Sequence, residues 1–288
     1  QALPLPEFSD RSFLEAIGVV STCENPARAL QFARYLQARD RGAPVFTRHG
    51  FRAVGGDRWN PRPKLLLYAG AMLNRAVDQA VHEFSIREGV EITRVYNGCG
   101  ILVGQMNAGA QPDAYFSCDQ SFMDLVANRF EDAIPISENP LVFLTASENP
   151  HNLKTLADLT KPGLRIGLAH PEKSALGFLT RRLLQELGLE RQLLESDNLK
   201  LEAPQGDLLV SSMASGALDA IVIYKSNAFG QKERLQIHPI DSELAIARQP
   251  FAVSKDSPHS QTMNRLLEAI STAQVQQRFQ DLGFQWVK

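Results

Sequence analysis

Four residues with sulfur or imidazole side chains could together bind a soft metal ion: Met72, Cys99, Cys118 and His170. Thioether, thiolate and imidazole are ligands that suit Cu(I) and similar ions. The sequence contains no C-x-x-C pair, so the fold would have to assemble such a site from distant segments. Cys99 could instead act as a nucleophile with His170 as its base, although no G-x-S-x-G or H-E-x-x-H motif accompanies them.

Two glycine-flanked turns offer a different chemistry, the binding of an anion by backbone amides. Each turn follows an apolar run and precedes a helical pattern. The first N–H groups of a helix lack intrahelical partners, and the helix dipole adds about half a positive charge there. Glycine lets the backbone approach a ligand closely. The candidate residues are Gly70, Ala71, Met72, Gly98, Cys99 and Gly100.

The elements that must position these turns alternate between strand and helix. Apolar runs predict strands at residues 64–69, 90–96, 114–117, 165–168 and 220–224. Helical periodicity predicts helices at residues 72–87, 100–108 and 122–129. This alternation predicts parallel βαβ units, in which ligand sites lie at the carboxyl ends of the strands.

Composition narrows the classes of protein that fit. The 288 residues include 30 Lys+Arg and 32 Asp+Glu, and 44% are hydrophobic. This balance indicates a globular chain and no broad basic surface for nucleic acid. Three cysteines are too few for a disulfide scaffold. Residues 1–20 show no signal-peptide pattern, so a leader has been removed or the chain comes from a longer precursor.

A partial repeat marks the organisation of the chain. The Gly/Pro-rich stretch at residues 55–63 predicts a linker, which gives an N-terminal segment with linker at 1–63 and a domain at 64–288. At a shift of 233 positions, Pro6, Val20, Ser21, Phe46, Gly50, Phe51 and Val54 recur as Pro239, Val253, Ser254, Phe279, Gly283, Phe284 and Val287. Both segments are predicted as strand, helix, short helix and Gly-Phe. Residues 6–54 are therefore interpreted as a partial copy of the end of a domain like 64–288.

The motifs within residues 64–288 carry a resemblance. They include Gln-x-x-Ala-Gly-Ala-x-Pro-Asp-Ala from residue 105 and Ser-x-Asp-Gln from residue 117. The chain resembles the periplasmic molybdate-binding proteins of ABC importers, within the type II periplasmic solute-binding family. The resemblance implies an α/β fold of two lobes joined by crossing strands, a ligand cleft between the lobes, a periplasmic or other extracytoplasmic location, and delivery to a membrane permease without catalysis.

The resemblance also implies further site residues. Leu176 and Gly206 stand where the family has a third and a fourth amide donor, and Tyr224 stands where it has a tyrosine hydroxyl. Met72 and Cys99 stand where the family has two ligand-contacting serines. A thioether and a thiol are poor replacements for two hydroxyls.

This departure leaves alternatives open. The main interpretation is a small oxyanion, similar to molybdate or tungstate, held without a resident cofactor. A soft metal ion bound by Met72, Cys99, Cys118 and His170 is the second, and a thiol-dependent enzyme or a sensory module without ligand is the third.

Overall fold

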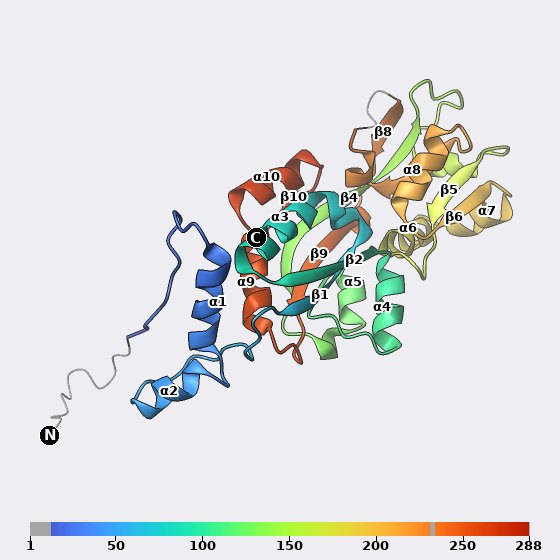
Figure 1. Cartoon of the computed structure of the whole chain (residues 1–288). Coiled ribbons are helices and arrows are strands. Elements are labelled where there is room, and N and C mark those ends of the chain that lie inside the picture. Colours follow the sequence, from blue (N-terminus) through green and yellow to red (C-terminus); the bar gives the residue numbers. More distant parts are fainter. Residues whose placement is uncertain (1–12, 231–233, 288) are drawn as a thin grey trace. The chain divides into compact units, whose positions relative to one another are not determined.

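The computed structural model describes residues 13–230 and 234–287. The chain divides into two compact units (Figure 1). The first comprises Gln1–Pro61 with Arg87–Gly89, and the second comprises Arg62–Ile86 with Val90–Lys288. Among the described residues, none of the helices combines the length and the apolar character that spanning a bilayer requires.

The first unit contains two helices, α1 (Pro26–Gln37) and α2 (Gly42–Arg48). Asn25 caps α1 by accepting a hydrogen bond from the Arg28 amide at 3.4 Å. Both helices were expected from the repeat. A strand was also expected before them. Residues 13–20 form no strand and pair with no strand of the described structure. Pro6, the first residue of the repeat, lies outside the described residues.

The second unit is a mixed α/β fold of two lobes (Figure 1). Its strands are β1 (Lys64–Gly70), β2 (Glu91–Asn97), β3 (Ala114–Phe116), β4 (Ile134–Ala146), β5 (Ile166–Ala169), β6 (Leu199–Ala203), β7 (Ala220–Tyr224), β8 (Leu235–Pro239), β9 (Ile246–Val253) and β10 (Gln285–Trp286). Its α-helices are α3 (Asn74–Glu88), α4 (Cys99–Asn107), α5 (Gln120–Asp124), α6 (Ala175–Glu186), α7 (Glu190–Glu195), α8 (Gly206–Ala214), α9 (Ser260–Ile270) and α10 (Ala273–Asp281). Short 3₁₀ helices are η2 (Ala71–Leu73), η3 (Ala127–Arg129), η4 (Leu156–Thr160), η5 (Lys225–Ala228) and η6 (Glu243–Ala245).

Strand β4 joins the lobes. The strand order is β2-β1-β3-β9-β4-β7-β5-β6, and β8 and β10 also pair with β4. The first half of β4 pairs antiparallel with β9 in one lobe, and the second half pairs antiparallel with β7 in the other. The first lobe therefore contains β1, β2 and β3, and the second contains β5, β6 and β7.

Each lobe is built on parallel strands, and those in the interior of the sheet are buried. β1 pairs parallel with β2 and β3, and β5 pairs parallel with β6 and β7. All residues of β5 and β7 are buried, as expected for strands covered on both faces. The predicted parallel α/β arrangement is confirmed, and the predicted strand at residues 220–224 matches β7 in full.

One predicted helix needs correction, and several strands were not predicted. The helix expected at residues 122–129 is interrupted, because α5 ends at Asp124 and the backbone of the buried Val126 leaves the helical region before η3 begins. The residue patterns also did not reveal the long strand β4. Its role as a crossing strand between lobes agrees with the implication of the resemblance.

Candidate functional site

Two helix starts in the first lobe follow neighbouring strands. β1 ends at Gly70 and continues into η2 and α3, and β2 ends at Asn97 immediately before Gly98 and α4. Gly70 pairs with Asn97 in the parallel register. The register therefore places these two helix starts side by side at the carboxyl edge of the sheet.

The second lobe repeats this arrangement. The end of β5 leads through Ser174 into α6, and the end of β6 leads through Gln205 into α8. Ala169 and Ala203, the last residues of the two strands, are paired in the parallel register. Two further helix starts therefore lie at one edge of the second lobe.

None of these four helix starts is capped by its own N-cap side chain. The N-caps Gly70, Gly98, Ser174 and Gln205 make no side-chain cap hydrogen bond. By contrast, Asp119 caps α5 by accepting from the Ser121 amide at 3.0 Å. Amides of an uncapped first turn are donors that a bound anion can satisfy.

The helix starts of both lobes meet at a small pocket of about 20 Å³. A wider pocket of about 220 Å³ adjoins it, and five residues line both pockets. The small pocket is lined by Ala71, Met72, Asn97, Gly98 and Cys118 from the first lobe and by Ser174, Pro204, Gln205, Gly206, Asp207, Tyr224 and Asn227 from the second. It is therefore a site between the lobes of the second unit.

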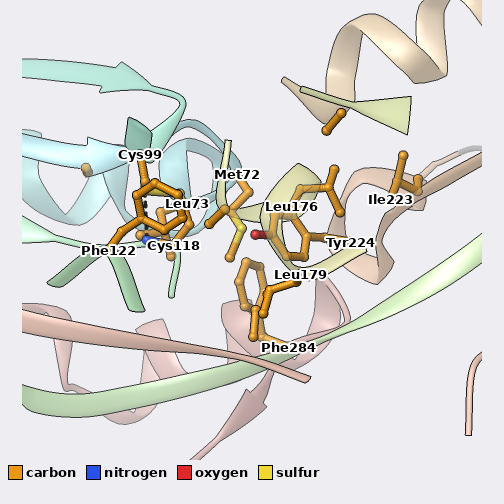
Figure 2. Close-up of a cluster of buried hydrophobic side chains, with 14 of the residues drawn as sticks. Met72, Leu73, Cys99, Cys118, Phe122, Leu176, Leu179, Ile223, Tyr224 and Phe284 are labelled. Carbon is orange, nitrogen blue, oxygen red and sulfur yellow. Dashed lines mark hydrogen bonds between the residues drawn. A yellow bond between two sulfur atoms is a disulfide. The ribbon is translucent and has the colours of Figure 1, made fainter. Parts of the chain in front are cut away.

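The hydroxyl of Tyr224 is a donor aimed into this pocket. The residue is 4% exposed, and its hydroxyl has no hydrogen-bond partner among the described residues. Figure 2 shows the ring beside Met72, with the hydroxyl directed toward that side chain. Burial, together with the negative charge of Asp119, raises the pKa of Tyr224 well above its ordinary value. The hydroxyl therefore stays protonated at physiological pH and available to donate.

Asn227 supplies an acceptor on the same wall. Its Nδ2 donates to Oδ1 of Asp207 at 2.9 Å, which fixes the orientation of the amide, and its buried Oδ1 has no partner among the described residues. A Cβ on Gly206 would lie 2.6 Å from this Oδ1. Glycine is therefore required at the start of α8 if Asn227 is to keep its place.

The wider pocket adds one cation to this polar wall. Arg75, from the first turn of α3, lines it together with Asn74, Tyr96 and Ser226. The Tyr96 hydroxyl donates to Asp78 at 3.0 Å, outside the pocket wall. Among the residues that line the two pockets, Arg75 and Asp207 carry charged side chains.

Five of the predicted ligand-binding residues line the small pocket: Ala71, Met72, Gly98, Gly206 and Tyr224. The other four are close to it without forming its wall: Gly70, Cys99, Gly100 and Leu176. The side chains of Cys99 and Leu176 are fully buried, each within its own lobe. At the start of α6, the wall residue is the N-cap Ser174.

The soft-metal interpretation is wrong for the two cysteines. Cys99 and Cys118 form a disulfide that links the start of α4 to the segment after β3, with their Cα atoms 6.2 Å apart (Figure 2). A disulfide provides no thiolate to a metal. The ring Nδ1 of His170 instead accepts a hydrogen bond from the Glu172 amide at 3.2 Å. The described residues contain no cluster of three His, Cys, Asp or Glu residues that could hold a metal ion.

The same bond removes the proposed catalytic nucleophile. A thiol-dependent reaction needs a free thiolate, and the sulfur of Cys99 is bonded to Cys118. Cys23 is the free cysteine in the described chain, and it lies in the first unit.

Sequence reasoning missed several polar wall residues: Asn97, Ser174, Gln205, Asp207 and Asn227. Asn97 is the last residue of a parallel strand and the other four lie a few residues after one, which is the signal that could have identified them. Glycine and sulfur-containing residues stand out in the sequence, whereas these ordinary polar side chains do not.

Comparisons with known proteins agree with this geometry. The family model described as bacterial extracellular solute-binding protein matches residues 65–285. The molybdate-binding protein ModA of Mycobacterium bovis is 29% identical over 168 residues, which are 57% of this chain and 62% of that protein. The chain thus spans under two thirds of the length of that relative.

Solved structures share the fold. The periplasmic molybdate-binding protein of Azotobacter vinelandii has a TM-score of 0.66 at 15% identity, covering 78% of this chain and 100% of its own. The sulfate-binding protein SubI of Mycobacterium tuberculosis H37Rv has a TM-score of 0.65 at 16% identity, covering 79% and 88%. With a family model matching most of its length and two lobes around a polar pocket, this chain belongs to the bacterial extracellular solute-binding proteins.

Proposed function

We propose that this chain is the extracytoplasmic solute-binding component of an ABC importer and that it holds a small oxyanion between its lobes. One observation carries the proposal: four uncapped helix starts and the unpartnered Tyr224 hydroxyl converge on one small pocket. Amide and hydroxyl donors around a small cavity suit an anion with several acceptor oxygens. These orphan polar groups also argue against a module that has lost its ligand.

The location and the partner follow from the same proposal. Disulfides persist in oxidising compartments such as the periplasm and are rare in the cytosol, so the Cys99–Cys118 bond supports a place outside the cytoplasm. The receptor then delivers its ligand to a membrane permease. The match to a family of binding proteins supports binding rather than catalysis as its task.

The wall chemistry divides the oxyanions into two groups. Molybdate, tungstate and sulfate are fully deprotonated at neutral pH and can only accept hydrogen bonds. Hydrogen phosphate also donates one, which the unpartnered Oδ1 of Asn227 could accept. Asp207 on the same wall disfavours a ligand without a proton. Molybdate and tungstate remain the first choice because the relative with 29% identity is a molybdate-binding protein.

Titration calorimetry with molybdate, tungstate, sulfate and phosphate tests the proposal. A hydrogen bond to a charged ligand contributes about 1.5–3 kcal/mol, so Tyr224→Phe should weaken binding by roughly 10- to 150-fold. Tyr35→Phe, in α1 of the first unit, is the matched control and should bind as the wild type does. Absence of binding for all four anions, or equal affinity in the Tyr224→Phe variant, would refute the proposal.

A further inference from the structure

The first two helices of the chain repeat the last two at a constant shift. Moving α1 (Pro26–Gln37) by 233 positions gives residues 259–270, and α9 is Ser260–Ile270. Moving α2 (Gly42–Arg48) by the same amount gives residues 275–281, and α10 is Ala273–Asp281. The repeat seen in the sequence is thus also a repeat of local structure.

The turn after the second helix is the same in both copies. Gly50 has φ of 88° and Gly283 has φ of 95°, a left-handed conformation that glycine adopts without strain. The amide that follows each glycine donates back to a phenylalanine carbonyl. The Phe51 amide donates to Phe46 at 3.1 Å, and the Phe284 amide donates to Phe279 at 3.0 Å.

Ring packing and the end of the first helix agree as well. The Phe46 and Phe51 rings meet edge to face with centroids 5.8 Å apart, and Phe279 and Phe284 do so at 5.0 Å. The amide of Ala38 donates to the carbonyl of Tyr35. At the shifted positions, the Ser271 amide donates to the Glu268 carbonyl.

The two copies differ in what covers their apolar face. In the C-terminal copy, Val253, Phe279 and Phe284 are at most 4% exposed. Their counterparts Val20, Phe46 and Phe51 are 71%, 42% and 51% exposed. We call these three exposed side chains the N-terminal apolar face. Phe46 and Phe51 contact each other, and exposed apolar side chains that adjoin one another mark an interaction surface.

The C-terminal copy shows what such a face packs against. Phe279 contacts Phe116 of β3 with centroids 6.4 Å apart, and Val253 pairs with Ala114 of the same strand. Trp286 of β10 also contacts Phe279, edge to face, with centroids 5.3 Å apart. The natural cover of this motif is therefore the first-lobe sheet of a solute-binding domain.

We infer that residues 13–54 close a second solute-binding domain, encoded ahead of them in the same polypeptide and lacking its own last two helices. The N-terminal apolar face docks on the first-lobe sheet of that domain. A second copy of this chain is the weaker occupant, because α9 and α10 already fill the equivalent place in each copy. This inference does not depend on the identity of the ligand.

Hydrogen exchange on the protein expressed from its complete reading frame tests the inference. Amides of residues 26–54 should exchange roughly 100-fold more slowly there than in the 288-residue chain. Phe51→Asp should abolish that protection and leave the anion-induced rise in melting temperature of residues 64–288 unchanged. Arg52→Asp, at an exposed neighbouring position, is the matched control and should keep the protection.

The remaining outcomes overturn the inference. Equal protection in the 288-residue chain would mean that its own second unit covers the face. Protection that rises with protein concentration would assign the face to a second copy. A reading frame without a preceding domain, or protection that survives Phe51→Asp, would also refute it, and the wild-type comparison stands even if the variant misfolds.

Discussion

The side-chain amide of Gln205 donates a hydrogen bond of 2.9 Å to Oδ1 of Asn97. Gln205 is the N-cap of α8 in the second lobe, and Asn97 ends β2 in the first. The same Oδ1 also accepts from the Gly98 amide at 2.9 Å. This bond therefore joins the lobes across the pocket and fixes the start of α4 at the same time.

Removing this bond should weaken ligand binding without unfolding the protein. A neutral hydrogen bond contributes about 0.5–1.5 kcal/mol, so Gln205→Ala should lower affinity by roughly 2- to 12-fold. Calorimetry with the anion that binds best measures this change. Gln185→Ala, on the exposed surface of α6, is the control, and an equal loss in both variants would contradict a role for the interlobe bond.

Gly100 is needed where the lobes touch. A Cβ at this position would overlap the backbone carbonyl of Glu172 in the second lobe, so an alanine must hold the lobes apart or displace that loop. Overpacking costs about 1–3 kcal/mol, and Gly100→Ala should weaken anion binding by roughly 5- to 150-fold. Small-angle scattering should show a smaller ligand-induced compaction.

The same helix supplies the control for this substitution. A Cβ on Gly104, one turn later in α4, would have no neighbour within 4 Å. Gly104→Ala should keep wild-type affinity and raise stability by up to about 1 kcal/mol through helix propensity. Wild-type affinity in Gly100→Ala would show that the close approach of the lobes is not needed for binding.

The disulfide should stabilise the first lobe and exclude soft metals. It closes a loop of 19 residues in sequence separation, and a loop of that order contributes about 3 kcal/mol. The double variant Cys99→Ser/Cys118→Ser should therefore lose about 3 kcal/mol in urea unfolding, whereas Cys23→Ser should lose little. Oxidised wild type should bind no Cu(I) at the site. Stoichiometric Cu(I) binding there would contradict the assigned bond.

The fold was largely predictable because its parallel strands are short apolar runs with helices between them. Residues 220–224 illustrate this, since all five are apolar or aromatic and all are buried. β4 was missed because Pro135, Pro140 and a polar stretch between them disguise it. Pro135 is tolerated because it lies at a bulge in the pairing with β9. Pro140 lies where β4 changes its partner from β9 to β7, and the neighbouring Asn139 bonds to Ser226 at 2.8 Å.

The site was predictable only in part, because backbone amides leave no side-chain signature. Gly98 and Gly206, which were predicted from their residue type, line the small pocket and lie where another chain segment approaches closely. The pairing of Cys99 with Cys118 depends on how α4 packs beside β3, a tertiary relationship that spacing does not encode. Asn227 was missed for a similar reason, because its role depends on Asp207, which comes from another helix.

The free energy of unfolding should depend on pH through the charge of Asp158. This residue takes part in the cap at the start of η4 in the second lobe. Oδ1 of Asp158 lies 2.8 Å from Nζ of Lys161, and Oδ2 accepts from the amides of Lys154 and Thr155 at 2.8 and 2.9 Å. The hydrogen bond from Lys161 is the largest cause that lowers the pKa of Asp158, and the two amides add to it. The folded state therefore prefers the carboxylate.

The sign of the effect follows from this preference. Because the folded pKa lies below the unfolded value of 3.8, the stabilisation is complete above pH 3.8 and is lost as the pH falls toward the folded pKa. Asp158→Asn should cost about 1 kcal/mol at pH 7, and the difference from wild type should shrink below pH 4. Urea unfolding between pH 7 and pH 3, with Asp132→Asn as the exposed control, measures it. A difference independent of pH would show that the charge at Asp158 does not stabilise the folded state.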